Sequence, residues 1–386
     1  MRSREADILQ SYLEDRAVKM NNWLTPWWID KAYLEARTPL PIVTNPGVSF
    51  PMWNYSGIDG QIETAAKVAQ SALKFYLIIM NDELPQERVG DVYLDMKQYK
   101  YLFGTTRIPA LLKDKILYGN QYQPLPKHFV VMRNGHLFRV PAFDSNGRLL
   151  SVKQLENELK QYVMPTSGDI CKCPVGVVTS EYRDKWADLY ARLKEGSKEL
   201  SRKEVGMLFM FDVYEKGDLE AVVCSTLRGI TQMVELFRVP AFDSNGRLLS
   251  VKQLENELKQ YVMPTSGDIC KCPVGVVTSE YRDKWADLYA RLKDTNAESV
   301  RCVEEALFVL CIDKPMEGIP GASALDLQSL QCLHGGGCEN NSHNRWFDKT
   351  LQFIIGTDGY CGINYEHTPI EGPPVATLME FICVQL

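Results

Sequence analysis

Apolar side chains alternate with other positions in the stretch 344–374, which divides into two short segments around a turn. Within residues 351–355 every second residue is apolar, as expected where one face of a strand packs on a core. The pair Asp358-Gly359 follows, and Asp-Gly between two such segments is typical of a tight hairpin turn. The pattern therefore predicts two antiparallel strands, with His367 at the end of the second.

Similar patterns predict elements elsewhere in the chain. Residues 4–22 have an apolar face at helical spacing, and residues 62–80 form the most apolar helix. Residues 128–138 form a second hairpin around an Asn-Gly pair, and the apolar run 307–311 indicates a strand. Pro373-Pro374 opens a last helix, because proline is tolerated in the first helical turn. The residues themselves thus show helices that alternate with hairpins.

A perfect internal duplication divides the sequence. Residues 137–194 and 236–293 are the same 58 residues without a difference, and residues 195–235 between them are an insert with no recognisable match. Solenoid repeats drift in sequence and need three or more copies, so this pair is instead typical of a tandem exon, an assembly error or a very recent duplication. Residues 1–136 and 294–386 join the outer ends naturally. One copy is therefore expected to occupy the fold, with the other loosely packed.

The composition is that of an ordinary globular protein. The 386 residues are 45% hydrophobic and 24% charged, and a net charge of -6 gives no support for a nucleic-acid partner. Glu63, Lys67 and Lys74 interrupt the most apolar helix, so no transmembrane segment is expected. Residues 1–7 show no targeting signal, because they lack the apolar core of a secretory peptide. An intracellular protein is expected.

Neither a metal site nor a disulfide framework is predicted from the eleven cysteines, which do not cluster. The Cys-Lys-Cys pairs at 171–173 and 270–272 are two copies of one pair, and their one-residue gap is not the usual zinc spacing. His334 and His343 have no third ligand at a recognisable spacing. Cys361 lies inside a predicted strand rather than beside a cation, which argues against a nucleophile.

His367 is the candidate general base. A histidine side chain can take a proton from an alcohol near neutral pH, because its ordinary pKa is about 6.5. Glu371 follows four residues later and would orient the ring or stabilise its charged form if the backbone curls between them. Prolines and glycines at 369–374 favour a turn rather than a regular helix there. The alternative is a histidine that only makes structural hydrogen bonds.

The whole string around His367 carries more information than the histidine alone. Arg-Trp-Phe-Asp-Lys at 345–349, the predicted hairpin, and Glu-His-x-x-x-Glu-Gly-Pro-Pro at 366–374 resemble the second signature of the choline/carnitine acyltransferase family. The resemblance gives His367 the role of general base, with Glu371 beside it. Residues 95–99 and 106–109 are similar to a further region of the family and are assigned mostly to structure.

The stretch 23–34 is similar to the Asn-Trp-Leu-x-x-Trp-Trp-x-x-x-Ala-Tyr segment of the same family. The resemblance implies that Trp28 and Tyr33 line the cleft that holds a quaternary ammonium alcohol. Aromatic faces attract such a cation, so this role is chemically coherent. On the residues alone, tryptophans in a helical core are the competing interpretation.

What the resemblance implies about architecture is an α/β fold, a mixed sheet with flanking helices like one lobe of the chloramphenicol acetyltransferase type. Family members continue through a second lobe that holds coenzyme A, and nothing in this sequence is similar to it. The second lobe is therefore expected to be missing and the chain to be incomplete. Residues 1–136 are then the N-terminal part of the lobe, and residues 294–386 complete it with the catalytic hairpin.

The implied function is carnitine acyltransferase activity, the reversible transfer of a short acyl group between coenzyme A and carnitine. Acyl-CoA is a co-substrate, no permanently bound cofactor is expected, and a monomer is implied. Residues 365–367 and 371–374 look most like the carnitine acetyltransferase members. Relatives work in mitochondria or peroxisomes, so the same location is implied in fatty acid metabolism.

Three other functions remain open. A catalytically inactive fragment or pseudoenzyme of the same family is the first, and a choline or medium-chain acyltransferase is the second. An esterase is the third, because His-Gly-Gly-Gly at 334–337 is also an oxyanion loop of lipases. That loop works with a Gly-x-Ser-x-Gly elbow, and none occurs in the sequence.

Overall fold

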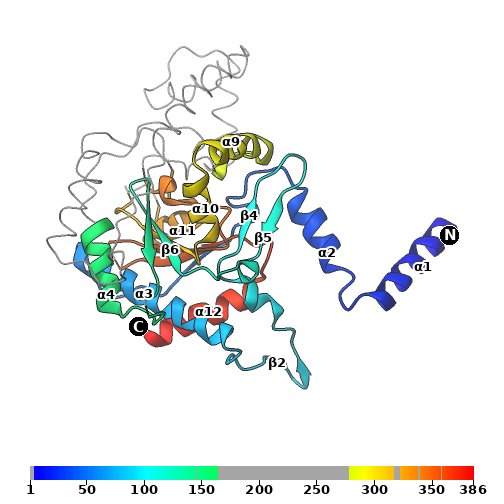
Figure 1. The fold of residues 1–386 in the computed structure, drawn as a ribbon, viewed down its shortest axis with the longest axis horizontal. Coiled ribbons are helices and arrows are strands. Elements are labelled where there is room, and N and C mark those ends of the chain that lie inside the picture. The colour runs from blue at the N-terminus through cyan, green and yellow to red at the C-terminus, as the bar shows by residue number, and fades with distance from the viewer. Residues whose placement is uncertain (1–3, 145, 164–277, 317–321, 338–339, 358) are drawn as a thin grey trace, which may run out of the picture.

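The chain folds around one mixed β-sheet covered by helices on both faces, as the computed structural model shows (Figure 1). The described residues are 4–144, 146–163, 278–316, 322–337, 340–357 and 359–386.

The sheet has six strands, and their spatial order differs from their order in the chain. β6, β8 and β9 run parallel, and the remaining neighbours pair antiparallel. The prediction of a mixed sheet with flanking helices is therefore confirmed. In spatial order the strands are β1 (Gly47–Ser49), β10 (Cys361–Tyr365), β9 (Leu351–Ile355), β8 (Val309–Ile312), β6 (His128–Arg133) and β7 (His136–Pro141).

Both predicted hairpins are present. β9 pairs with β10 from Leu351 opposite Tyr365 to Ile355 opposite Cys361. In the other hairpin, β6 and β7 are joined by Asn134 and Gly135, with φ of 52° and 78°. Two successive positive φ values match the right-handed twist of the strands they connect, and Asn-Gly adopts them most readily.

The central strands are buried on both faces, which corrects the expectation that alternate positions of residues 351–355 face outward. All five side chains of β9 are buried. Phe353 packs in the core on one face of the sheet and Ile354 in the core on the other. Parallel strands in the middle of a sheet are covered on both sides, so alternation there separates two cores rather than core from solvent.

Helices from distant parts of the chain cover these two faces. α3 (Gly57–Met80) and α12 (Gly372–Gln385) contribute buried residues to the larger core, as predicted for residues 62–80 and for the last helix. α9 (Arg282–Thr295) and α10 (Ala297–Glu305) contribute to the second core. α10 leads into β8.

The N-terminal helix confirms its prediction but contributes nothing to the core. α1 (Arg4–Lys19) has no buried residue and projects from the rest of the protein (Figure 1). α2 (Thr25–Trp28) follows and continues as the π-helical segment η1 (Ile29–Leu34). The alternative of a tryptophan core is wrong, because Trp27 and Trp28 are 42% and 53% exposed.

The described part of the fold draws on both copies of the duplicated sequence. The first copy supplies most of β7, α4 (Val152–Glu158) and η4 (Leu159–Val163), whereas the second copy supplies α9. The expectation that a single copy fills the fold therefore differs from the arrangement found. The rest of both copies and residues 195–235 lie outside the described residues.

The remaining elements are short and lie on the periphery or in connections. These elements are β2 (Arg88–Val89), β3 (Val92–Tyr93), η2 (Lys97–Tyr101), β4 (Thr106–Ile108), β5 (Lys115–Leu117), η3 (Gly119–Gln121), α11 (Ala324–His334) and η8 (Ser342–Asn344).

In the part of the chain that the structure describes, no helix is both long and apolar enough to cross a membrane.

Candidate active site

The sheet fixes the backbone at His367. β10 lies between β1 and β9, and His367 follows its last residue, Tyr365, by two positions. The His367 amide donates to the carbonyl oxygen of Thr44 at 3.3 Å. Its side chain is 22% exposed, so the imidazole is held by the protein while one part of it stays open to solvent.

Two tyrosine rings pack against the imidazole. The Tyr33 ring stacks on it with centroids 5.8 Å apart and planes 12° apart, and the Tyr365 ring lies 5.6 Å away at 30°. Tyr33 comes from η1 and Tyr365 from the end of β10, so the His367 ring contacts aromatic residues from two segments far apart in the sequence. Such packing restricts rotation of the imidazole about its side-chain bonds.

Each nitrogen of the ring faces a polar group. Nδ1 lies 3.3 Å from the hydroxyl of Tyr33, and Nε2 lies 3.5 Å from Oε2 of Glu371. A carboxylate only accepts hydrogen bonds, so one tautomer satisfies both contacts, with the proton on Nε2 and the phenol donating to Nδ1. Burial raises the pKa of the Tyr33 phenol, and the negative charge of Glu371 raises it further, which keeps the phenol a donor.

Glu371 lies at the start of α12, and the backbone turns between it and the histidine. Its own amide donates to Oε1 of Gln98 at 2.9 Å, which fixes the turn. The Glu371 side chain is 50% exposed. A negative charge at this end of a helix is favourable, because the helix dipole is positive there.

Trp28 extends the aromatic group on its outer side. Its ring meets Tyr33 edge-on with centroids 6.4 Å apart. The structure therefore brings together all four residues singled out from the sequence: Trp28, Tyr33, His367 and Glu371. The aromatic faces can attract a cation, and the imidazole beside them can accept a proton from a hydroxyl on the same ligand.

A buried group of charged residues adjoins the imidazole, and sequence reasoning did not place it at the site. Arg107 on β4 bonds Glu366 and Thr368, the two neighbours of His367 in the chain. Asp114 bonds Arg107 and also Arg282 of α9. The sequence carries no local signal for this group, because its members come from separate segments of the chain.

Histidines 334 and 343 lie in a separate buried place. Burial lowers the pKa of His334 to about 4 and that of His343 to about 3, and the positive charge of Arg345 adds to both shifts. Among the described residues no group of three or more histidine, cysteine or acidic side chains is arranged to hold a metal ion.

The glycines after His334 end a helix. Gly335 follows α11 with φ of 82°, and the next two glycines also have positive φ. This left-handed conformation favours glycine and is common after the last turn of a helix. The esterase interpretation of the glycine run therefore has a structural alternative at this position.

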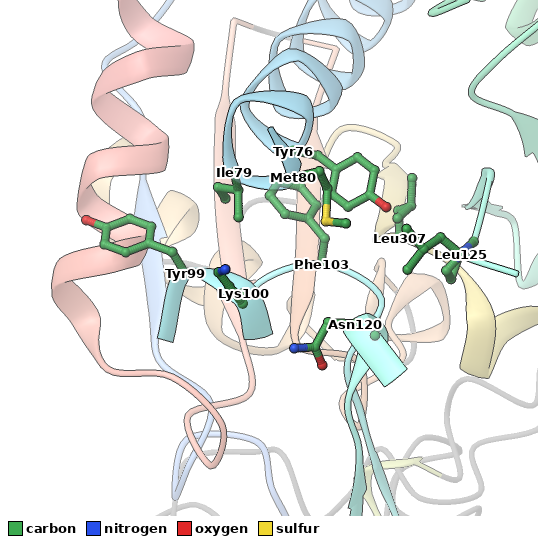
Figure 2. A pocket seen from close by; sticks show the side chains of 11 residues that line it. Tyr76, Ile79, Met80, Tyr99, Lys100, Phe103, Asn120, Leu125 and Leu307 are labelled. Atoms are coloured by element: carbon green, nitrogen blue, oxygen red, sulfur yellow. The ribbon is translucent and has the colours of Figure 1, made fainter. Parts of the chain in front are cut away.

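A small cavity lies elsewhere in the described fold. It has room for about one water molecule, with a volume of about 10 Å³. Figure 2 shows Tyr76, Phe103 and Leu307 around it. None of the four candidate site residues lines it, so it adds nothing to the site.

The chain is similar to known acyltransferases. A family described as Choline/Carnitine o-acyltransferase matches residues 1–207 and 228–386. The Carnitine O-acetyltransferase of Columba livia is 30% identical over 97% of this chain and 44% of its own length, and that of Homo sapiens is 28% identical with the same coverage. The Choline O-acetyltransferase of Homo sapiens is 25% identical over 95% of this chain and 36% of its own length. The chain thus spans less than half the length of these curated relatives.

Proposed function

Because this chain belongs to the choline/carnitine O-acyltransferase family, we propose that it supplies the general base for reversible transfer of a short acyl group between coenzyme A and carnitine. The observation that carries the proposal is the His367 ring, packed against Tyr33 and Tyr365 and facing Glu371 at 3.5 Å. Carnitine is preferred to choline because the two carnitine enzymes compared above have the higher identities.

In the proposed reaction His367 removes the proton from the hydroxyl of the alcohol. The alkoxide attacks the thioester carbonyl of acyl-CoA, the carbon–sulfur bond breaks, and the thiolate takes the proton back from the imidazolium. No covalent acyl-enzyme and no permanently bound cofactor are needed, so acyl-CoA acts only as a co-substrate. Glu371 stabilises the imidazolium while it exists, because its carboxylate is 3.5 Å from Nε2.

The substrate hydroxyl has to approach a ring nitrogen, and in the unliganded arrangement both nitrogens have partners. The hydroxyl therefore replaces one of these partners when the alcohol binds. The trimethylammonium group of carnitine is placed against Trp28 and Tyr33, where cation–π attraction contributes about 0.5–2 kcal/mol. This position leaves the hydroxyl within reach of His367, since Tyr33 contacts both Trp28 and His367.

The test joins this chain to the part of the Columba livia relative that lies beyond the matched segment. The fusion should transfer acetyl groups from acetyl-CoA to carnitine, and His367→Gln should lower kcat by about 10²–10⁴-fold. The 386-residue chain alone should have negligible activity, because the resemblance places the cleft between two lobes. A folded fusion that is inactive, or one that His367→Gln leaves unchanged, would refute the proposal.

We further propose a monomer located in mitochondria or peroxisomes, as implied by the family resemblance. Sedimentation of the purified chain tests the first point. Fluorescent tagging of the product of its complete transcript tests the second, and a secreted product would contradict it.

A further inference from the structure

One buried guanidinium joins the segments on either side of the candidate base. Arg107 is 1% exposed, and its Nε donates to Oδ2 of Asp114 at 2.8 Å. Its Nη2 donates to the carbonyl oxygen of Tyr33 at 2.7 Å. Its Nη1 donates to Oε1 of Glu366 at 3.2 Å and to Oγ1 of Thr368 at 3.1 Å.

Two of these acceptors flank His367 in the chain. The Thr368 amide donates to Oε2 of Glu366 at 3.2 Å, and the Thr368 hydroxyl donates to Oε1 of the same carboxylate. The two neighbours of His367 are therefore joined to each other by two hydrogen bonds from Thr368 to the buried carboxylate of Glu366. Burial raises the pKa of Glu366, and the positive charge of Arg107 opposes this shift. Arg107 thus favours the ionised form of Glu366, which accepts the hydrogen bonds from Thr368 and Arg107.

A further acceptor of Arg107 is the carbonyl oxygen of Tyr33, whose ring is stacked on the His367 ring. Tyr33 is held through its carbonyl oxygen by Arg107, and its ring lies 5.8 Å from that of His367 with planes 12° apart. One planar side chain therefore fixes both partners of the stack from separate directions. A lysine can replace the charge but not this geometry, because its single ammonium lacks the rigid fork of donors.

We propose that Arg107 is a positioning residue for the general base, setting the near-parallel arrangement of the Tyr33 and His367 rings. Its importance for catalysis rests on the proposed function. The arrangement itself can be measured without turnover, because the protons of a stacked imidazole lie in the ring-current field of the tyrosine.

The experiment records NMR spectra of the 386-residue chain with labelled histidine, in which His367→Gln identifies the signals of the base. Tyr33→Leu gives the shift of the imidazole protons without the stacked ring. Arg107→Lys should move these protons toward that reference by at least half of the full displacement. Arg345→Lys is the matched control, since Arg345 is equally buried but bonds Asp313 and the carbonyl oxygens of Gln331 and Asn344.

Circular dichroism decides which variants are compared. If Arg107→Lys does not fold, Thr368→Val replaces it, because this change removes one acceptor of Nη1 and keeps the volume. Thr368→Val should give a smaller displacement in the same direction, whereas Thr368→Ser, which keeps the hydroxyl, should give none. Unmoved His367 protons in folded Arg107→Lys, or in folded Thr368→Val when that variant is the substitute, would overturn the proposal. An equal displacement in the control would also overturn it.

The outcomes separate this proposal from the proposed function. A fusion that transfers no acyl group, combined with the expected displacement in Arg107→Lys, would refute the function and leave the positioning role. An active fusion, combined with unmoved His367 protons in folded Arg107→Lys, would refute the positioning role and leave the function.

Discussion

Truncating Trp285 tests how the duplicated sequence is used in folding. Trp285 on α9 is fully buried, packs edge-on against Tyr289 and Trp346, and donates from Nε1 to Oδ2 of Asp348 at 2.6 Å. Replacing a buried tryptophan by alanine costs about 3–5 kcal/mol, and a buried acceptor that loses its donor adds about 1 kcal/mol or more. If only the second copy could form α9, Trp285→Ala would lower the free energy of unfolding by about 4–6 kcal/mol.

The first copy offers a replacement, because residues 179–194 have the same sequence as residues 278–293. If residues 179–194 formed the helix in place of residues 278–293, two connections would have to be closed, residues 164–178 before the helix and residues 195–293 after it. With the second copy in place there is one connection, residues 164–277. Closing two connections instead of one costs about 2 kcal/mol of chain entropy by the logarithmic law. This cost is smaller than that of the empty tryptophan site. We therefore expect Trp285→Ala to cost only about 2 kcal/mol, because the copies exchange.

Urea unfolding followed by circular dichroism measures the effect. Trp186 is the counterpart of Trp285 in the first copy, and Trp186→Ala alone should change the free energy of unfolding by less than about 0.5 kcal/mol. The double variant should show the full loss of about 4–6 kcal/mol. The exposed Trp27→Ala serves as the control for removing a tryptophan. If Trp285→Ala alone costs as much as the double variant, the copies do not exchange and the reasoning is wrong.

Three further predictions concern the site and the pH dependence of stability. Glu371→Gln in the fusion should lower kcat about 10-fold or more with little change in KM, because the imidazolium loses its carboxylate partner. Trp28→Leu should instead raise KM for carnitine by about 2- to 30-fold, the equivalent of the cation–π energy, as steady-state kinetics will show. Burial holds the pKa of His343 at about 3 and that of His334 at about 4, below the value of about 6.5 in an unfolded chain. The unfolded chain therefore binds protons that the folded chain does not. The contribution of these two histidines to the free energy of unfolding is complete above pH 6.5 and falls as the pH drops toward 4. Between pH 7 and pH 4.5, His343→Gln should lose less of it than the unaltered chain in urea titrations; an equal loss would contradict this assignment.

Local patterns predicted the elements well where the signal lies within a few residues. The Asn-Gly pair at 134–135 and the alternation in residues 351–355 gave both hairpins, and helical spacing gave α3 and α12. The alternation did not reveal that β9 is covered on both faces, because the order of strands in the sheet decides which positions meet solvent. The residues alone left open whether Trp28 is buried or exposed, since burial depends on what packs against a helix.

The site divides in a similar way. His367 and Glu371 lie in one string of residues, so their proximity could be expected from the sequence. The contact of Tyr33 with the ring joins residues 334 positions apart, and the resemblance had suggested only that Tyr33 lines the cleft. Arg107 gave no such hint, because its partners come from three different segments. Buried ion pairs of this kind are determined by the assembled fold and have no local spacing.

The duplication and the site are connected through one carboxylate. Oδ2 of Asp114 accepts from Nε of Arg107 at 2.8 Å and from Nε of Arg282 at 2.6 Å, and Arg282 belongs to the duplicated sequence. Arg282 also bonds Asp348, which precedes β9 of the hairpin that carries the base. Removing a charge from a buried network leaves its partners uncompensated and costs about 3–5 kcal/mol.

Whichever copy forms α9 must therefore bring its arginine into contact with Asp114. Arg183 is the counterpart of Arg282 in the first copy. Each single change, Arg183→Leu or Arg282→Leu, should leave the His367 protons near their original shifts, since the intact copy supplies the arginine. The double change should displace them, because Oδ2 of Asp114 then loses the arginine that it shares with Arg107, and Arg37 remains on the other oxygen. If Arg282→Leu alone displaces the His367 signals as far as the double change, the second copy is used without exchange, and the duplication gives the site no protection.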